Sequence, residues 1–343
     1  MHGIRIAVSW PSANAFRSGC RRSTVGFPEK RARLTRNDCL WVVVLAAGEG
    51  RRVRALTTDA SGASVPKQYC TFGGHKSMLR WALDRALGLV PPQRIVTVVA
   101  QEHRRWWKRD LSVIPAENVI VQPRDQGTAV GILLGVLYAL FRQGPQLRVL
   151  VQPSDHYVRD ERILRRSLRE AIGNVERDPD RAVLLGMAPD GFDGEYGWIL
   201  PAPSGRARVR SVALFREKPD AATAAELRSR GGLLNTLLFT ANAGTLLRLY
   251  ERALPALLAT FLAGVPRDVG WSPERLETVY RALSFHDFSR DVLERFPGEL
   301  SVLPVPPCGW SDLGTPARLM HFLAGQGAQD SRLGPGAAAM GGL

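Results

Sequence analysis

The chain has 343 residues, 45% of them hydrophobic, which is enough for one large α/β domain or two smaller ones. Its longest apolar runs, residues 39–48 and 129–141, are shorter than the roughly 20 residues that a membrane-spanning helix needs, so we expect a soluble protein without a membrane partner. The net charge of +14 raises nucleic acid as a partner, but half of this excess lies in the first 37 residues.

The four cysteines, Cys20, Cys39, Cys70 and Cys308, stand singly in the sequence. They form no C-x-x-C pair and have no histidine at the spacing of a metal ligand. This pattern fits neither a zinc site nor a disulfide framework, and it predicts a reducing, cytoplasmic location.

Both ends of the chain differ in composition from its centre. Residues 1–37 hold eight Lys or Arg and one acidic residue, without the apolar core of a signal peptide. This Arg/Ser-rich composition faintly resembles a transit peptide, but we interpret it as a disordered basic extension. Residues 324–343 are rich in Gly and Ala and predict a flexible tail, which leaves 38–323 as the folded domain.

Within that domain, short β-branched runs alternate with stretches of helical period. The strand-like runs lie at 40–46, 94–100, 118–122, 148–152 and 182–187, and the helical stretches at 77–90, 101–111, 127–141 and 161–175. Further strand-like pieces follow at 196–201, 207–219 and 233–239, before a helical block at 241–296. This order predicts a Rossmann-like α/β fold: one mixed, mostly parallel sheet with helices on both faces.

The first strand-like run is followed at once by Gly48, Gly50, Arg51 and Arg52. Glycines let backbone N–H groups approach an anion, and arginine offers a planar donor fork to phosphate. The stretch is not a Walker loop, because the G-K-[ST] ending is missing, and an ordinary tight turn is the alternative. Lys67, in the Pro-Lys-Gln stretch that follows, adds a second fixed cation and favours a phosphate site.

Two aspartates fall where strands and loops should meet the same edge of the sheet. Asp155 follows the fourth strand-like run, and Asp312 lies in the Gly-Trp-Ser-Asp stretch. Asp155 could instead cap the next helix, whereas Thr315 is available to cap the helix after Asp312. Two carboxylates beside two cations are suited to Mg²⁺ and a polyphosphate.

Eight short motifs occur in the order and spacing of the sugar-1-phosphate nucleotidyltransferases, and they cover about residues 40–320. The motifs are LAAGEGRR, PKQ, QPRDQGTA, PSDH, EYGW, FREKPD, LLNT and GWSDLG. The combination of PKQ with PSDH is most similar to the mannose-1-phosphate guanylyltransferases of this family. The resemblance implies the nucleotide-diphospho-sugar transferase type of fold.

The resemblance also implies roles for individual residues. It places Gly48, Gly50 and the catalytic Arg52 on the triphosphate, and the catalytic Lys67 beside the reacting phosphorus. It assigns the base to Gln122, Gly127 and Thr128, the metal to Asp155 and Asp312, and the sugar phosphate to Gly197, Glu217, Lys218 and Asn235. Asp287 matches a family position as well, although it could equally cap a helix. The structural alternatives are a strand bend at Gly197, a turn at Asn235 and a solvated pair formed by Glu217 and Lys218.

The sequence departs from the family pattern in three places. Arg51 stands where a small hydroxyl residue is usual, the segment from Arg52 to Lys67 is about four residues longer, and Asn235-Thr236-Leu237 replaces a frequent Asn-Ser-Gly. These departures leave the chemistry intact and put the identity of the sugar in doubt.

The resemblance implies an enzyme that joins GTP to mannose 1-phosphate with release of pyrophosphate, using Mg²⁺. A glucose-1-phosphate nucleotidyltransferase is one alternative, although that type usually carries Pro-Lys-Pro in place of Pro66-Lys67-Gln68. The shorter cytidylyltransferases of isoprenoid synthesis lack the FREKP and GWSDLG elements. A nucleic-acid-binding protein that uses the basic, aromatic stretch 103–109 is an alternative from another class. The base, the hexose and the presence of a homo-oligomer stay open.

Overall fold

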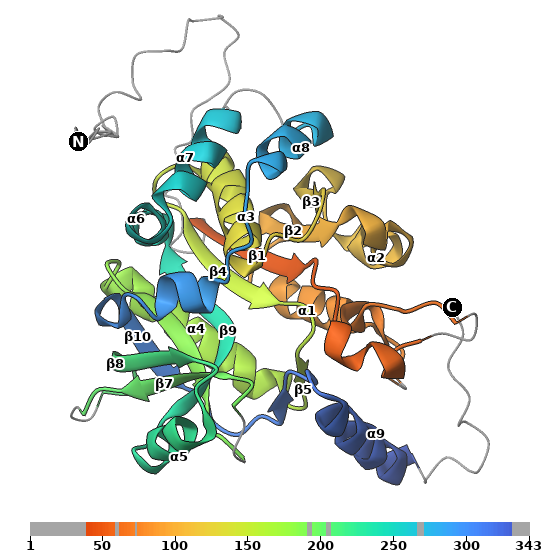
Figure 1. Ribbon diagram of the computed structural model, residues 1–343, viewed down its shortest axis with the longest axis vertical. Helices are drawn as coiled ribbons and strands as arrows, with labels where there is room; N and C mark the ends of the chain where they lie inside the picture. The colour runs from red at the N-terminus through yellow and green to blue at the C-terminus, as the bar shows by residue number, and fades with distance from the viewer. Residues whose placement is uncertain are drawn as a thin grey trace, which may run out of the picture. The chain divides into compact units, whose positions relative to one another are not determined.

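A nine-stranded mixed sheet runs through the described part of the chain (Figure 1). The computed structural model describes residues 39–330 except 59–61, 73, 191–193, 204–206 and 266–270, and it describes side chains as far as residue 324. The predicted basic extension therefore lies outside the described residues. The strands of the sheet are β1 (Leu40–Ala46), β2 (Ile95–Ala100), β3 (Val119–Gln122), β4 (Arg148–Pro153), β6 (Ala182–Met187), β7 (Gly197–Pro201), β8 (Arg210–Glu217), β9 (Leu233–Asn242) and β10 (Leu300–Pro304).

The strand order is β3-β2-β1-β4-β9-β6-β10-β8-β7. β1 pairs in parallel with β2 and with β4, and β10 pairs in parallel with β6. β9 is antiparallel to both of its neighbours β4 and β6, with Phe239 opposite Val151 on one side and Leu184 on the other. The predicted mixed sheet is thus confirmed. β9 separates the parallel group β3-β2-β1-β4 from a second group in which β6 and β10 are parallel and β8 is antiparallel to both β10 and β7.

Helices cover both faces of the sheet, as the alternating pattern predicts. They are α1 (Met78–Leu87), α2 (Arg104–Asp110), α3 (Thr128–Gln143), α4 (Glu161–Arg177), α5 (Ala221–Ser229), α6 (Ala243–Ala253), α7 (Pro255–Gly264), α8 (Pro273–Arg281) and α9 (Pro316–Asp330). No helix within the described residues combines the length and the apolar character needed to cross a membrane. α9 continues past Leu323, where the sequence predicts the end of the folded domain, so that boundary stays a prediction.

The two sides of β1 supply two separate cores. Trp41 and Val43 belong to the cluster that α3, α6, α7 and α8 cover, whereas Val42 and Val44 belong to the cluster under α1, α2, α4 and α5. A strand that is buried on both faces reads as a continuous apolar run rather than an alternating one. The continuous apolar run therefore identifies the first strand. It does not indicate which of its residues face which side of the sheet, because both sides are buried.

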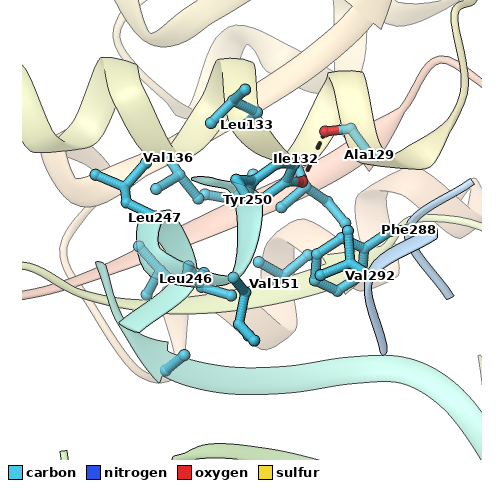
Figure 2. Packing of buried hydrophobic residues seen from close by; sticks show 14 of the residues in the cluster. Ala129, Ile132, Leu133, Val136, Val151, Leu246, Leu247, Tyr250, Phe288 and Val292 are labelled. Atoms are coloured by element: carbon cyan, nitrogen blue, oxygen red, sulfur yellow. Dashed lines mark hydrogen bonds between the residues drawn. The ribbon is translucent and has the colours of Figure 1, made fainter. Parts of the chain in front are cut away.

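The larger core centres on the contact between α3 and α6 (Figure 2). Tyr250 of α6 is fully buried, and its hydroxyl donates a hydrogen bond to the carbonyl of Ala129 at 2.7 Å. Phe288 stacks on Phe239 of β9 with ring centroids 5.2 Å apart. These contacts join the first turn of α3 to the central strand β9 and to the segment before the π-helical turn η9 (Ser289–Leu293).

Two glycines in helices provide a matched test of how tightly α3 packs on β1. A Cβ added at Gly135 would lie 2.5 Å from Cγ1 of Val43, whereas a Cβ added at Gly173 of α4 would meet no atom within 4 Å. Alanine is favoured over glycine inside a helix by about 0.5 to 1 kcal/mol, but overpacking a core costs about 1 to 3 kcal/mol. We therefore predict that Gly173→Ala increases the free energy of unfolding and that Gly135→Ala decreases it by about 1 to 2 kcal/mol.

Urea unfolding of both variants beside the wild-type chain measures this difference. Equal stabilisation by the two substitutions would contradict the close contact between α3 and β1.

Candidate active site

A buried lysine joins three segments that are distant in the sequence. Lys67 begins the short helix η4 (Lys67–Tyr69), and the residue is only 4% exposed. Its Nζ lies 2.7 Å from Oδ2 of Asp155 and also donates a hydrogen bond to the backbone carbonyl of Asp312. Because a buried ammonium needs compensating partners, Lys67 holds the ends of β4 and of the 309–314 loop together.

The residues after Lys67 support the first glycine loop. Gln68 donates from Nε2 to the carbonyls of Ala46 at 3.1 Å and Gly48 at 2.7 Å, and the Tyr69 hydroxyl donates to Ala46 at 2.8 Å. Gly50 has a φ of +62°, and a Cβ there would lie 3.1 Å from Cβ of Lys67. The loop therefore requires glycine at position 50, and the space beside Gly48 stays open.

Asp155 does not cap the next helix, which was the structural alternative for this residue. Asp160 caps α4 by accepting hydrogen bonds from the N–H groups of Arg162 and Ile163. Burial alone would raise the pKa of Asp155, but the Lys67 ammonium more than offsets this effect and holds the pKa below its usual value. Asp155 is therefore a carboxylate at neutral pH.

The neighbouring His156 is held in its neutral form. Burial lowers the pKa of His156 to about 4, against the opposing influence of Asp155. Nε1 of Trp310 donates to Nδ1 of His156 at 3.3 Å, which is compatible only with an unprotonated Nδ1. The imidazole therefore adds no positive charge at neutral pH.

Asp312 is surrounded by donors. Its Oδ1 accepts hydrogen bonds from the Tyr196 hydroxyl at 2.7 Å and from the Gly314 N–H at 3.0 Å, and Nε of Arg318 lies 3.2 Å away. Among the described residues, no group of three or more His, Cys, Asp or Glu side chains is arranged to hold a metal ion. Of the two predicted metal ligands, Asp155 has fewer polar groups in contact with its carboxylate than Asp312 has.

A central cavity brings most of the predicted site residues together. Its lining includes the predicted residues Arg52, Lys67, Thr128, Asp155, Gly197, Glu217, Asn235 and Asp312. Gly50 stands behind this lining, beside Lys67. Lys218 is exposed and does not belong to the lining, so its role in the site stays a prediction.

Glu217 faces this cavity in an unusual state for a carboxyl group. Its Oε2 is buried without a hydrogen bond, and a Cβ added at Gly197 would lie 2.5 Å from that oxygen. Burial, reinforced by the nearby carboxylate of Asp287, raises the pKa of Glu217 to about 7. Gly197 therefore provides the space that the Glu217 carboxyl group occupies. Its role goes beyond the strand bend that was the structural alternative for this residue.

The stretch Asn235-Thr236-Leu237 lies within β9 at the cavity wall, where the pairing of β9 with β6 is irregular. Nδ2 of Asn235 donates to the Ser289 hydroxyl at 3.2 Å, and its Oδ1 accepts from the Leu237 N–H at 3.2 Å. Leu237 has a φ of +55°, a left-handed conformation that favours glycine. This conformation explains why a glycine would suit the position and shows that Leu237 carries backbone strain beside the site.

A side pocket adjoins the central cavity at Thr128, which lines both. The side pocket also contains the predicted residues Gly48, Gln122 and Gly127. Gly127 has a φ of +89°, and a Cβ there would lie 2.2 Å from the His286 carbonyl oxygen. Since Thr128 Oγ1 also accepts a hydrogen bond from the Phe288 N–H at 2.8 Å, the 286–288 segment fixes the first turn of α3.

Several lining residues were not predicted from the sequence. Those in the central cavity are His156, Glu195, Tyr196, Thr236, Leu237, Ser289 and Trp310, and those in the side pocket include Asp125 and Phe285. Most of them stand inside the eight motifs, so a search of each motif for further polar and aromatic side chains could have found them. Phe285 carries no such signal. Asp287 combines both roles considered for it, because it lines the cavity and accepts a hydrogen bond from the Arg290 N–H.

The basic, aromatic stretch 103–109 packs into the fold. Trp107 is buried and donates from Nε1 to the Ala100 carbonyl at 3.1 Å, and the Arg105 guanidinium lies 4.0 Å from the centre of the Trp106 ring. Trp106 also stacks on Tyr69, with ring centroids 6.1 Å apart. These aromatic rings are thus occupied by internal contacts, which weakens the nucleic-acid alternative.

Comparison with known proteins relates this geometry to one family. The family model described as Nucleotidyl transferase matches residues 41–325. The alginate biosynthesis protein AlgA of Pseudomonas syringae pv. tomato is 27% identical over 284 residues, which are 79% of this chain and 56% of that protein. A mannose-1-phosphate guanylyltransferase of Salmonella muenchen is 29% identical over 187 residues, which are 53% of this chain and 38% of that protein. The chain thus spans about half the length of the first of these relatives.

A solved structure agrees with these similarities. A Thermus thermophilus protein described as a mannose-1-phosphate geranyltransferase is 28% identical, with a TM-score of 0.68 over 80% of this chain and 76% of that one. A Helicobacter pylori structure described as a mannose-6-phosphate isomerase is 19% identical, with a TM-score of 0.59 over 79% of this chain and 99% of that one, and shows a similar fold. The nucleotide-diphospho-sugar transferase fold that the sequence predicts is therefore confirmed.

The raised pKa of Glu217 predicts a pH-dependent stability. A carboxyl group whose pKa rises on folding, here from 4.5 to about 7, favours the folded state below pH 4.5, and this contribution is lost as the pH rises through 7. Glu217→Gln removes the cost of the buried charge. We predict that the variant matches the wild-type chain near pH 4 and exceeds its free energy of unfolding by about 1 to 3 kcal/mol at pH 8.

Urea unfolding at pH 4, 6 and 8 measures this difference, and Glu226→Gln on the exposed face of α5 is the control. A stability difference between Glu217→Gln and wild type that does not change with pH would contradict the assignment.

Proposed function

Since this chain belongs to the nucleotidyl transferase family, we propose that it joins a nucleoside triphosphate to a sugar 1-phosphate with release of pyrophosphate. We infer GTP and mannose 1-phosphate as the substrates because relatives of the chain include mannose-1-phosphate guanylyltransferases. The product would be GDP-mannose. The observation that carries the proposal is the buried Lys67 beside Asp155 and Asp312, at the wall of a cavity that Arg52 also lines.

The proposed reaction needs no general base. The phosphate group of a sugar 1-phosphate has a second pKa of about 6, so it is mostly a dianion at pH 7 and can act as the nucleophile. One of its oxygens forms a bond to the α-phosphorus, and the bond from this phosphorus to the bridging oxygen of the β-phosphate breaks. Pyrophosphate leaves with that electron pair. The neutral His156 is therefore not required to accept a proton.

The residues of the central cavity would lower the repulsion between the two anions. Lys67 is held in place by its two partners, so it would offer a fixed positive charge to the α-phosphate without having to reorganise during the reaction. Arg52 pairs with Glu195 and both side chains are about half exposed, so the guanidinium can exchange this partner for a phosphate at little cost. The glycine loop at Gly48 and Gly50 would bring backbone N–H groups to the triphosphate.

The residues present fit a magnesium ion that is held partly by substrate. Mg²⁺ is commonly bound by one or two carboxylates together with phosphate oxygens and water, so a site with two protein carboxylates is sufficient. Asp155 and Asp312 line the same cavity, and the side chain of Asp155 is 36% exposed there. When bound, the ion would supply charge neutralisation to the phosphates.

The far wall of the central cavity would receive the sugar. Glu217 and Asn235 offer hydrogen-bonding groups to hydroxyls, and Gly197 leaves room for the Glu217 carboxyl group at this wall. A carboxyl group with a pKa of about 7 can donate as well as accept a hydrogen bond near neutral pH. This property suits the recognition of hydroxyl groups, which both donate and accept, and it does not by itself distinguish mannose from glucose.

A cytoplasmic location is proposed on the state of the cysteines. Cys39, Cys70 and Cys308 are free thiols among the described residues. Free, partly buried thiols are typical of proteins in a reducing compartment.

The proposal is tested by measuring pyrophosphate release by the purified chain with Mg²⁺. Nucleoside triphosphates are combined one by one with mannose 1-phosphate, glucose 1-phosphate and related hexose phosphates. We expect release that requires both GTP and mannose 1-phosphate. Release only with another pair would keep the reaction and change the substrates, whereas no release with any pair would reject the proposal.

Substitutions in the central cavity extend this test. Removing one preorganised charge or donor typically costs a factor of about 10² to 10³ in rate, so Lys67→Ala and Asp155→Ala should each lose at least that much activity. Lys76→Ala is the control, because this lysine pairs with Asp84 on the surface. Near-normal turnover by the folded Lys67→Ala variant would contradict the proposed role.

A further inference from the structure

The side pocket has the shape and chemistry of a site for a planar ring. Its walls are mostly apolar and include Leu45, Ala47 and Val98, together with the backbone of Gly48 and Gly131. Phe285 lies at its edge with 63% of its surface exposed, which is more than any other large hydrophobic side chain within the described residues. An exposed phenylalanine beside an apolar pocket is suited to stack on an aromatic ligand.

Asp125 is the charged group in this pocket. Its Oδ1 accepts a hydrogen bond from the Gly127 N–H at 2.9 Å. Its Oδ2 has no hydrogen bond to any of the described residues, and Arg51 pairs with Glu49 at 2.6 Å rather than with Asp125. Asp125 is therefore oriented by the backbone and keeps Oδ2, together with the second acceptor site of Oδ1, for a ligand.

Gln122 complements Asp125 with donor groups. The Tyr280 hydroxyl donates to Oε1 of Gln122 at 3.1 Å, and the Gln122 side chain lines the pocket. Because its oxygen is engaged, the amide group presents N–H donors to a ligand. The pocket thus combines an acceptor at Asp125 with a donor at Gln122.

Among the common bases, guanine matches this pair of groups. Its N1–H and 2-amino group are adjacent donors that one carboxylate can accept together, and its O6 is the neighbouring acceptor. Adenine and cytosine place an acceptor next to their amino group, and uracil and thymine flank a single N–H with two carbonyls. A carboxylate facing any of these four bases would therefore meet at least one acceptor.

We propose that Asp125 determines the choice of base by reading the N1–H and 2-amino groups of guanine, while Phe285 stacks on the ring and Gln122 donates to O6. This inference rests on the proposed function, because it names the residues that select the nucleotide. It concerns specificity, so Asp125 takes no part in the reaction at the α-phosphorus.

The test compares GTP with inosine triphosphate, whose base lacks only the 2-amino group. Hydrogen bonds to a charged group are strong enough that the wild-type chain should prefer GTP over inosine triphosphate by at least about tenfold in kcat/KM. Asp125→Ala should bring this ratio close to one, and it should lower kcat/KM less for inosine triphosphate than for GTP, because hypoxanthine offers Asp125 only the N1–H. Asp180→Ala, on an exposed aspartate that pairs with Arg248, is the matched control and should keep the preference.

Asp125→Asn provides a second variant that keeps the acceptor for the Gly127 N–H. Its amide nitrogen replaces one carboxylate oxygen, so it should disfavour GTP and favour xanthosine triphosphate, whose base has a carbonyl in place of the 2-amino group. A gain of activity with xanthosine triphosphate relative to GTP, of about tenfold or more, is the expected result. A structural role for Asp125 would lower activity with all nucleotides alike.

Phe285→Ala should raise KM for GTP and for inosine triphosphate by a similar factor, about 5 to 100, with kcat little changed, and Phe285→Tyr should restore KM. If the wild-type chain uses no nucleoside triphosphate, the proposed function fails. If it is active but does not distinguish GTP from inosine triphosphate, or keeps its preference in Asp125→Ala, the inference is overturned and the proposed function stands. An unchanged KM in Phe285→Ala would exclude the stacking role.

Discussion

The buried ammonium of Lys67 is the constraint on which the candidate active site depends. A charge that is removed from water must be paired and hydrogen-bonded, and Lys67 meets this requirement through Asp155 at the end of β4 and the backbone carbonyl of Asp312. The adjacent Gln68 and Tyr69 tie the same segment to the end of β1. One short helix thus fixes the positions of the first glycine loop and both aspartates. Removal of the lysine would leave a carboxylate without its partner as well as a site without its charge.

The sequence contained enough information for the first half of the fold and too little for the order of the second half. In the first half each strand is followed by a helix, and such units have one favoured handedness, so a parallel sheet with two helical layers follows from the pattern. The place of β9 depends instead on antiparallel pairing with β4 and β6, which are far from it in the chain. Local periodicity identifies the run LLNTLLF as a strand but cannot select its neighbours. The tight fit of Gly127 against His286 has the same origin, because it joins segments about 160 residues apart.

The candidate site also combines features that the sequence reveals with features that only the folded structure reveals. Residues at the carboxyl ends of strands could be proposed from the sequence because the fold brings those ends to one edge, and Gly48, Arg52 and Asp155 do line the two cavities. The neutral state of His156 and the raised pKa of Glu217 arise from burial, which a sequence does not reveal. Phe285 could not be identified either, since a single aromatic residue is more often part of a core. Its exposure becomes informative only beside the side pocket.

The most direct test of this account is a crystal structure of the chain with the α,β-methylene analogue of GTP, which binds without being cleaved. The account predicts the α-phosphate within about 3 Å of the Lys67 ammonium, the triphosphate along the loop from Gly48 to Arg52, and the guanine ring in the side pocket against Phe285. Phosphates that lie away from Lys67, with its ammonium still paired only to Asp155 and Asp312, would contradict the central claim.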